Sequence, residues 1–226
     1  MDVGYYLRLL QESLPAFGAA AARTLLVSAL AFALAVALGI AAAVGMASKF
    51  RGLRWALAAY VEVFRDTPLL LQIFIAYFAT PALGLNLSPF QAGVATLALN
   101  GAAYLAVIFR AGLSSIPHAQ AESAFVLALT PWQTFRRVLL PQAARSVYPA
   151  VVNQLIIIIQ SSALLSAISY DEITSTTLLL NAQTFETMIL FSFAMIAYLL
   201  LTGFVSISSG VIAKVVFRAP LGRQGK

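Results

Sequence analysis

The sequence predicts an all-α integral membrane protein with five transmembrane helices. Of its 226 residues, 61% are apolar and only 10% are charged, against about 25% charged in an average soluble domain. Five stretches contain no charged residue and are the predicted spans: 25–44, 67–78, 90–109, 146–170 and 187–213. All except 67–78 reach the roughly 20 residues that cross a bilayer, and spans in lipid are helical because their backbone groups must pair internally.

Residues 1–18 are predicted to form an amphipathic segment at the outer membrane surface, ahead of the membrane domain at 19–216. Tyrosines and leucines lie on one side of a helix here, and charged residues lie toward the other, as in helices at a membrane interface. A frayed terminus is the alternative. Pro15 and Gly18 are expected to end this helix before the first span, and residues 217–226 are expected to form a cytoplasmic tail.

The second span is expected to begin at Pro68, because proline suits the first turn of a helix. Thr67 can cap that turn. Arg65 and Asp66 would then lie just outside the span, near the membrane surface. The first span is rich in alanine and contains Gly39, and such small residues let membrane helices pack closely.

A polar and basic segment, AESAFVLALTPWQTFRRVLLP, separates the third and fourth spans. It is predicted to hold a helix over about 119–129 and a second helix from Pro131, with Pro141 preceding the fourth span. Phe125 and Trp132 are aromatic anchors of the kind that dominate protein interfaces. The segment is either a docking surface for a partner or an ordinary amphipathic connector.

The basic residues predict the orientation of the chain. If the polar segment lies in the cytoplasm, only Arg8 and Arg23 among the basic residues lie outside, as the positive-inside rule requires. The N-terminus is then outside, the C-terminus is inside, and an outer loop carries Asp171, Glu172 and Glu186. The residues that face the cytoplasm are Lys49, Arg51, Arg54, Arg65, Arg110, Arg136, Arg137, Arg145, Lys214, Arg218, Arg223 and Lys226. The net charge of +6 needs no nucleic acid, because the cytoplasmic leaflet is anionic.

Polar side chains within spans are costly and are functional candidates. They are Thr67, Gln72, Asn100, Asn153, Gln154, Gln160, Ser161 and Ser162. Asn153 and Gln160 are seven residues apart and so share a helix face. These residues either line a central cavity and route or form hydrogen bonds between helices; Thr67 has the further alternative of a helix cap.

Other motifs argue against an enzyme. The sequence has no Gly-rich phosphate loop followed by Lys-Ser or Lys-Thr, no cysteine, and one histidine, His118, which is expected in a surface loop. No Ser-His-Asp arrangement falls in any span. We expect no catalytic residue, no metal site and no cofactor in this chain.

Several spaced blocks resemble the permease subunits of ABC importers. The segment from Glu122 to Pro141 is similar in register to their cytoplasmic coupling loop, Glu-Ala-Ala, three residues, Gly, nine residues, Ile-x-Leu-Pro. Residues 64–69, FRDTPL, resemble the Phe-Arg-Gly-Thr-Pro-Leu block of the polar amino acid permeases, the histidine, glutamine and glutamate family. Blocks at 103–120 and 132–154 also fit, and the resemblance covers roughly residues 24–210.

The resemblance implies a type I ABC importer permease in a bacterial inner membrane, which moves a polar amino acid by alternating access. Two permeases form the pathway, with a heterodimer favoured over a homodimer. A cytoplasmic ABC ATPase dimer, which binds ATP and Mg, docks on the coupling loop at about 111–144, and an external binding protein delivers the substrate. The expected coupling residues are Ala121, Glu122, Ser123, Ala124, Ala128, Leu129 and Pro131.

The chain departs from the family pattern at a few positions. Ala128 replaces the motif glycine, which indicates a turn without a positive φ. Val107 replaces a glutamate found in many relatives, and Gln160 and Ser161 replace a Lys-Asp pair. The uncharged positions favour an acidic or neutral amino acid over a basic one. An ATP-independent carrier or channel is the alternative, although ion-coupled carriers usually place charged residues within their spans; a structural membrane subunit is a third possibility.

Overall fold

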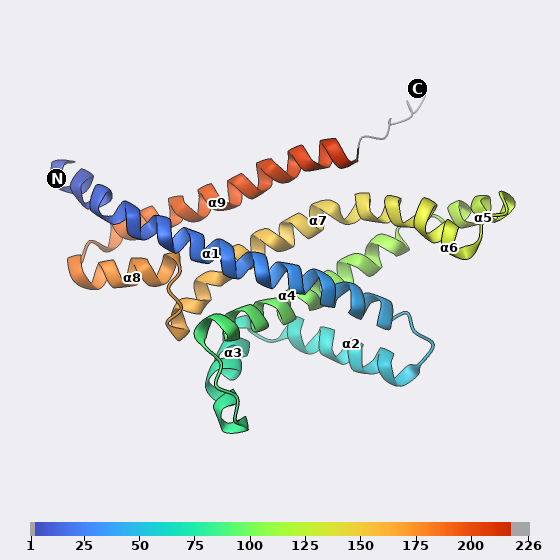
Figure 1. Ribbon diagram of the computed structural model, residues 1–226, viewed down its shortest axis with the longest axis horizontal. Helices are drawn as coiled ribbons and strands as arrows, with labels where there is room; N and C mark the ends of the chain where they lie inside the picture. Colours follow the sequence, from blue (N-terminus) through green and yellow to red (C-terminus); the bar gives the residue numbers. More distant parts are fainter. Residues whose placement is uncertain (1–2, 218–226) are drawn as a thin grey trace.

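The computed structural model describes residues 3–217, and within them all regular secondary structure is helical. The predicted all-α class is therefore confirmed. The four longest helices, α1 (Val3–Gly45), α4 (Pro89–Ser114), α7 (Leu140–Ser161) and α9 (Thr187–Val216), run along the long axis of the molecule (Figure 1). We call the two ends of this bundle the α5 end and the α8 end, after the short helices that lie there. The basic positions Arg218, Arg223 and Lys226 lie outside the described residues.

Four stretches of the described chain are long and apolar enough to cross a membrane. They are Arg8–Gly45, Pro89–Ser114, Pro131–Ile168 and Thr187–Val216. A fifth crossing is available only as a broken one, in which Arg51–Asp66 and Leu69–Leu83 meet at 109°. The sequence thus predicted the membrane class and the span count, but it did not predict that the second span is bent.

Small residues bring α1, α4 and α7 into close contact at the centre of the bundle. A Cβ atom added to Gly101 would lie 2.9 Å from Ile158 on α7 and 3.1 Å from Ala35 on α1. A Cβ atom added to Gly39 would lie 2.9 Å from the Cβ of Leu105. Larger side chains would separate these helices, so the small residues determine how closely the bundle packs. Gly101, Ala35 and Ile158 lie at the same level of their three helices.

The expected break at Pro15 and Gly18 is wrong, because α1 continues through both residues. Leu9 and Phe17, on either side of Pro15, are buried against Leu190 of α9. Packing on both sides of Pro15 keeps the helix continuous, although the local sequence favours a helix end there. Such packing is one way in which membrane helices tolerate proline.

The second span is built from four short pieces. Helix α2 (Arg51–Asp66) ends at the elbow, which we define as residues 63–72. Helix α3 (Leu69–Phe74), the π-helical turn η1 (Ile75–Ala79) and the 3₁₀ turn η2 (Thr80–Leu83) follow in a new direction, pointing away from the bundle (Figure 1). Thr67 was expected to cap α3, but it does not. Its hydroxyl donates to the carbonyl of Val63 at 2.6 Å, and Pro68 is the N-cap residue of α3.

The polar segment between α4 and α7 is also helical. Helix α5 (His118–Val126) is followed by α6 (Pro131–Thr134), the π-helical turn η3 (Phe135–Leu139) and α7. Pro141 does not begin a separate span: Leu140 donates to the carbonyl of Phe135 in a π-type bond, and the helix passes the proline without a break. After α7, the 3₁₀ turn η4 (Ser162–Ile168) leads to α8 (Ile173–Thr184), where the sequence predicted only a loop.

Candidate functional site

Helix α5 and its neighbour α6 form an arm that projects from one end of the bundle (Figure 1). The arm is held to the bundle where Gln142 Nε2 donates to Gln120 Oε1 at 3.4 Å. Ala124 is only 2% exposed, and α5 packs against α6 and η3. The alanine side of α5 therefore holds the arm together and does not face outward.

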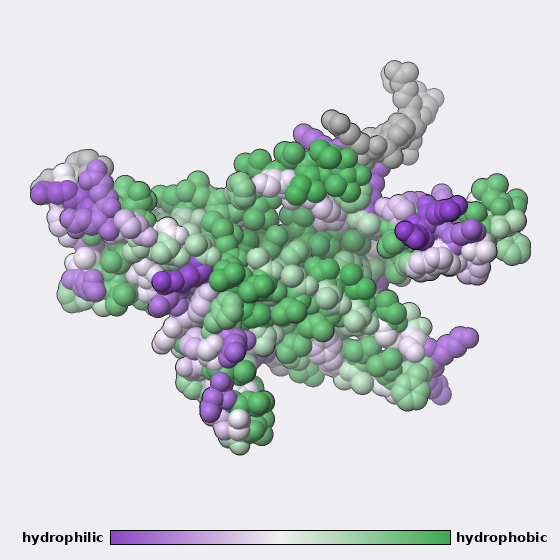
Figure 2. All heavy atoms as spheres, viewed as in Figure 1, coloured by the Kyte–Doolittle hydropathy of each residue, from purple (hydrophilic) through white to green (hydrophobic). Residues whose placement is uncertain are grey.

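The outward side of the arm is apolar at its tip. Phe125 is 81% exposed, Val126 is 82% exposed, and Leu127 and Trp132 are also exposed. Hydrophobic atoms gather at this tip, beside a strongly hydrophilic patch (Figure 2). Exposed large apolar side chains next to charged ones are typical of a protein-binding surface. Among the expected coupling residues, Glu122 and Ser123 are exposed on this arm, whereas Ala121 and Leu129 are half-buried.

The turn after α5 corrects the expectation for Ala128. Its φ is +53°, so the turn does adopt the left-handed conformation for which the family uses glycine. Leu129 N–H donates to the carbonyl of Ala124 at 3.1 Å, and Ala128 N–H donates to that of Phe125 at 2.9 Å. These bonds close the C-terminus of α5 in the manner of helices that end on a left-handed residue.

A capping box starts the helix on the far side of this turn. The hydroxyl of Thr130 accepts from the N–H of Gln133 at 3.3 Å, and Thr130 N–H donates to Gln133 Oε1 at 2.9 Å. Pro131 occupies the first turn of α6. Both ends of the short connection between α5 and α6 are therefore closed by hydrogen bonds, which restrict its conformation.

The elbow brings together three of the polar residues expected in the substrate pathway. Gln72 Nε2 donates to the Phe64 carbonyl at 2.9 Å and to Thr67 Oγ1 at 2.8 Å. Asn100 Nδ2 donates to the same Phe64 carbonyl at 2.9 Å and to Gln72 Oε1 at 3.1 Å. The two amides therefore satisfy a carbonyl that the bend in the helix leaves without an intrahelical partner.

The elbow lies beside the middle of α4, whereas Arg65 and Asp66 were expected near the end of the bundle. Asn100 is near the middle of α4. Tyr104 lies one turn later on the same helix, and its hydroxyl donates to the Arg65 carbonyl at 3.4 Å. The Arg65 guanidinium also lies 5.4 Å from the centre of the Tyr104 ring. A cation and a carboxylate thus lie at mid-height of a membrane bundle, and both residues are exposed on the protomer. The bend in the chain places them there, and nothing in the local sequence signals it.

An apolar groove of about 420 Å³ opens beside the elbow. Thr67 and Gln72 supply its polar edge, and Leu71, Ile75 and Leu99 are among its apolar walls. The groove is large enough for a small molecule or for side chains of a neighbouring subunit.

The polar residues of α7 point in different directions. Asn153 and Gln160 are exposed on one side, as their spacing predicted, whereas Gln154 is buried. Ser162 is fully buried, and its hydroxyl donates to the Ile159 carbonyl at 2.7 Å. Ser161 is half-buried. The structure therefore does not gather the α7 residues into one cavity with the elbow.

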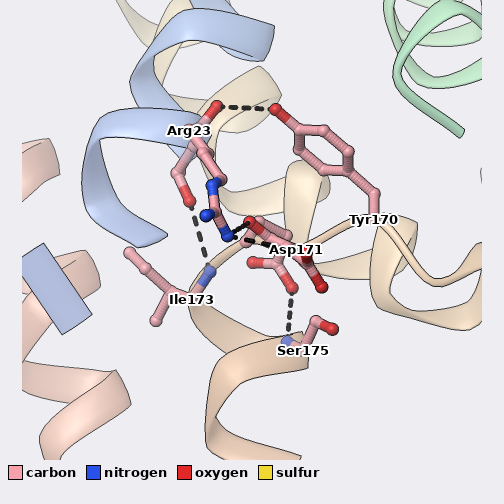
Figure 3. Close-up of polar contacts among 7 residues, drawn as sticks. Arg23, Tyr170, Asp171, Ile173 and Ser175 are labelled. Carbon is pink, nitrogen blue, oxygen red and sulfur yellow. Dashed lines mark hydrogen bonds and ion pairs between the residues drawn. The ribbon is translucent and has the colours of Figure 1, made fainter. Parts of the chain in front are cut away.

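A polar cluster at the α8 end was missed by the sequence analysis (Figure 3). Arg23 Nη1 lies 3.6 Å from the carboxylate of Asp171 and donates to that residue's carbonyl at 3.4 Å. The Tyr170 hydroxyl donates to the Arg23 carbonyl at 3.1 Å. These contacts fasten the segment after η4 to α1, and they join residues nearly 150 positions apart.

Glu172 is the buried member of this cluster, with no exposed surface. Its carboxylate accepts from the N–H groups of Thr174 and Ser175, at 2.9 Å and 2.8 Å, and so caps α8. The hydroxyl of Tyr198, on α9, also donates to it. Burial raises the pKa of the Glu172 carboxyl, and these hydrogen bonds offset part of that rise. The sequence signal for this cap is weak: an acidic residue, Glu172, directly precedes the polar first turn of α8.

Comparison with solved structures identifies the class of protein. The chain superposes on a crystal structure described as an amino acid ABC transporter with histidines, with a TM-score of 0.86 and 29% sequence identity. The match covers 92% of this chain and 97% of the other. The overall fold is thus that of the membrane-spanning permease of an ABC importer.

The particular family follows from the sequence itself. Residues 35–219 match the family described as the binding-protein-dependent transport system inner membrane component, and the chain belongs to that family. Among curated proteins, it is 40% identical over 127 residues to the arginine transport system permease protein ArtQ of Bacillus subtilis, covering 56% of this chain and 58% of that one. It is 36% identical over 150 residues to the L-cystine transport system permease protein TcyB of the same organism, covering 66% and 64%.

Proposed function

We propose that this chain is the translocation subunit of an ATP-driven importer that moves a polar amino acid across a bacterial inner membrane. The observation that carries this proposal is the projecting arm with its exposed apolar tip, on a chain whose family is binding-protein-dependent. A membrane bundle with no phosphate loop of its own needs a partner to supply energy from ATP. The arm offers that partner a rigid surface.

We place the arm in the cytoplasm and the α8 end outside. Exposed basic residues concentrate at the α5 end, as the positive-inside rule requires of the cytoplasmic side. They include Lys49, Arg51, Arg54, Arg110, Arg136, Arg137, Arg145 and Lys214. The α8 end carries the acidic residues Asp171, Glu172 and Glu186, and an external binding protein would dock on this side.

In this proposal, ATP binding draws the two ATPases together, and each pulls the arm that rests on it. The coupling residues are those on the arm, from Ala121 to Pro131. Because both ends of the turn after α5 are closed by hydrogen bonds, the arm transmits the pull to α4 and α7 as a rigid body. The bundle then opens outward in an alternating-access cycle.

The substrate pathway runs past the elbow and along the exposed side of α7, where a second permease would face it. Thr67, Gln72 and Asn100 contribute at the elbow, and the exposed Asn153 and Gln160 contribute opposite, with the half-buried Ser161 beside Gln160. Gln154 and Ser162 are buried and do not reach the exposed side of the bundle. Arg65 beside this route could pair with the α-carboxylate that every amino acid carries, so it does not select among them. The preference for an acidic or neutral amino acid rests on the uncharged positions Val107, Gln160 and Ser161. The relatives for arginine and for L-cystine differ in charge, so membership of the family leaves the substrate open.

One pull-down tests the proposal. The tagged full-length chain is purified from its native membrane in mild detergent, and the proteins that co-elute are identified. We expect an ABC ATPase together with a second permease, with a heterodimer favoured. Recovery of the chain alone, under conditions that keep other membrane complexes intact, would contradict the importer.

A substitution tests the proposed route. Gln160→Leu preserves the helical conformation of α7 and removes a polar side chain that faces the proposed pathway. Uptake by the reconstituted complex should fall, because a desolvated substrate loses a hydrogen-bonding partner there. Ile157→Leu, one turn earlier and also exposed, is the control. Equal uptake by both variants would mean that Gln160 has no part in the route.

A further inference from the structure

A basic pocket lies at the α5 end, apart from the arm. Its volume is about 310 Å³, and it is lined by Met46, Arg51, Arg54, Trp55, Ala58 and Arg110. Three elements meet there: the turn that follows α1, the first turns of α2, and the last turns of α4. Arg51, Arg54 and Ala58 share one face of α2, because they are three and four residues apart, and Arg110 reaches the same space from α4.

The three guanidinium groups have no anionic partner in the part of the chain that the structure describes. The ion pair found there joins Arg23 to Asp171, at the opposite end of the bundle. Arg110 donates instead to the sulfur of Met46 at 3.6 Å, which is a weak acceptor. Three positive charges therefore surround one small pocket without compensation.

The start of α2 adds to this imbalance. A helix N-terminus carries a partial positive charge and favours anions, yet the first turn of α2 holds arginines and no acidic residue. The N-cap residue, Phe50, supplies no side-chain hydrogen bond to the free N–H groups of that turn. Like charges three residues apart also repel each other. An anion in the pocket would offset all three effects.

Two large aromatic side chains are exposed beside the pocket. Trp55 is 74% exposed and Phe50 is 71% exposed, and tryptophan concentrates where a membrane meets water. A phosphate carried on acyl chains would match both features: the phosphate would face the guanidinium groups, which bind it in a bidentate manner, and the chains would lie on the aromatic surface. Basic pockets between helices at the cytoplasmic side are suited to lipid headgroups.

We propose that this pocket binds the phosphate headgroup of an anionic phospholipid from the membrane leaflet at the α5 end. The lipid neutralises the start of α2 and joins α2 to α4 on the side that leads to the elbow. The pocket is formed by residues outside the arm, so it acts separately from the ATPase dock.

Native mass spectrometry of the full-length chain in detergent tests this proposal. The chain is titrated with phosphatidylglycerol, with phosphatidylcholine of the same acyl chains, and with inorganic phosphate. We expect phosphatidylglycerol to bind at least about tenfold more tightly than either of the others. Arg54→Gln and Arg110→Gln should each weaken its binding about tenfold, the usual effect of losing one charge-assisted hydrogen bond.

Arg145→Gln is the matched control, because Arg145 is an exposed arginine at the same end of the bundle that does not line the pocket. It should bind phosphatidylglycerol as the unaltered chain does. Arg54→Lys, which keeps the charge, should fall between the unaltered chain and Arg54→Gln, and size-exclusion profiles check that each variant is folded.

Three results would overturn the proposal. Equal phosphatidylglycerol binding by the pocket variants and by Arg145→Gln would show that the lipid binds elsewhere. Binding of inorganic phosphate as tight as that of the lipid would make the site a free-anion site. Loss of the co-purifying ATPase in Arg54→Gln, with lipid binding unchanged, would assign the pocket to an acidic surface of that partner.

Discussion

Glu172 shows how a single residue can depend on its folded surroundings for its chemistry. The carboxyl has no exposed surface, and it contacts α8 through backbone N–H groups and α9 through the Tyr198 hydroxyl. Burial raises its pKa above the usual 4.5, so the folded state holds the proton more tightly than the unfolded state does. Stability from this group is therefore full below about pH 4.5 and declines as the pH rises through the higher pKa of the folded state.

The raised pKa of Glu172 predicts how the stability of the chain depends on pH. The midpoint of thermal unfolding of the purified chain should fall as the pH is raised from 4.5 through the range above it. Glu172→Gln cannot ionise, so its midpoint should change less with pH over the same range. Differential scanning fluorimetry of the two proteins side by side measures the difference. Parallel curves would show that Glu172 has the same pKa folded and unfolded.

Ala128 is a second residue whose role appears only in three dimensions. An alanine at a φ of +53° is strained by roughly 1 kcal/mol, and glycine would relieve that strain. We expect Ala128→Gly to slow hydrogen exchange at the amides of Leu127 and Leu129 by about two- to fivefold. Ala128→Val, with a branched side chain, should speed it. If glycine left exchange unchanged, the turn would not be strained.

At the scale of the element, helix α5 of the arm has two different sides. The alanine side of α5 packs inward, with Ala124 buried, and the side that carries Phe125 and Val126 faces outward. The family resemblance pointed to the alanine motif as the dock. In the structure Ala124 is buried, so we propose that the contact surface is formed by the exposed apolar residues at the tip.

The outward side predicts which substitutions uncouple the transporter. Phe125→Ser and Glu122→Lys should abolish co-purification of the ATPase and ATP-driven uptake while the chain stays monodisperse, because an exposed anchor is lost and a charge is reversed. Met188→Ser, which removes an equally exposed apolar residue at the α8 end, should retain the ATPase. Retention of the ATPase by Phe125→Ser would place the dock elsewhere. Ala124→Trp should instead disturb the arm itself and increase its cleavage by proteases.

At the scale of the whole molecule, the bend at the elbow changes what can be argued about energy coupling. The uncharged spans in the sequence argue against an ion-coupled carrier. Arg65 and Asp66 at mid-height of the bundle remove that argument, because charged residues at membrane depth also occur in ion-coupled carriers. The membership in a binding-protein-dependent family and the projecting arm then carry the case for ATP.

A vesicle experiment separates these two energy sources. The purified complex is reconstituted with its binding protein, and uptake is measured with ATP alone and with an imposed proton or sodium gradient alone. We expect uptake with ATP, and none with either gradient, since in the proposed mechanism the arm couples transport to the ATPase. Uptake driven by a gradient without ATP would establish the carrier mechanism.

The sequence by itself determined the all-helical membrane class, the four long spans and the position of the polar segment that forms the arm. The spans follow from the length of the apolar segments and from the need of backbone groups in lipid to pair internally. The helices of the arm follow from short-range turn preferences such as that of proline. The start of α6 illustrates this: Pro131 alone predicted a second helix there, and the capping box of Thr130 and Gln133 that begins it spans four residues and needs no tertiary contact.

Only the tertiary structure decided the rest. Pro15 lies inside a helix because Leu9 and Phe17 pack on α9, and Glu172 is a buried cap because Tyr198 reaches it from another helix. The elbow lies beside the middle of α4 because Asn100 donates a hydrogen bond to the Phe64 carbonyl. In each case the deciding contact joins residues far apart in the chain, and its energy outweighs a local preference of about a few kcal/mol or less.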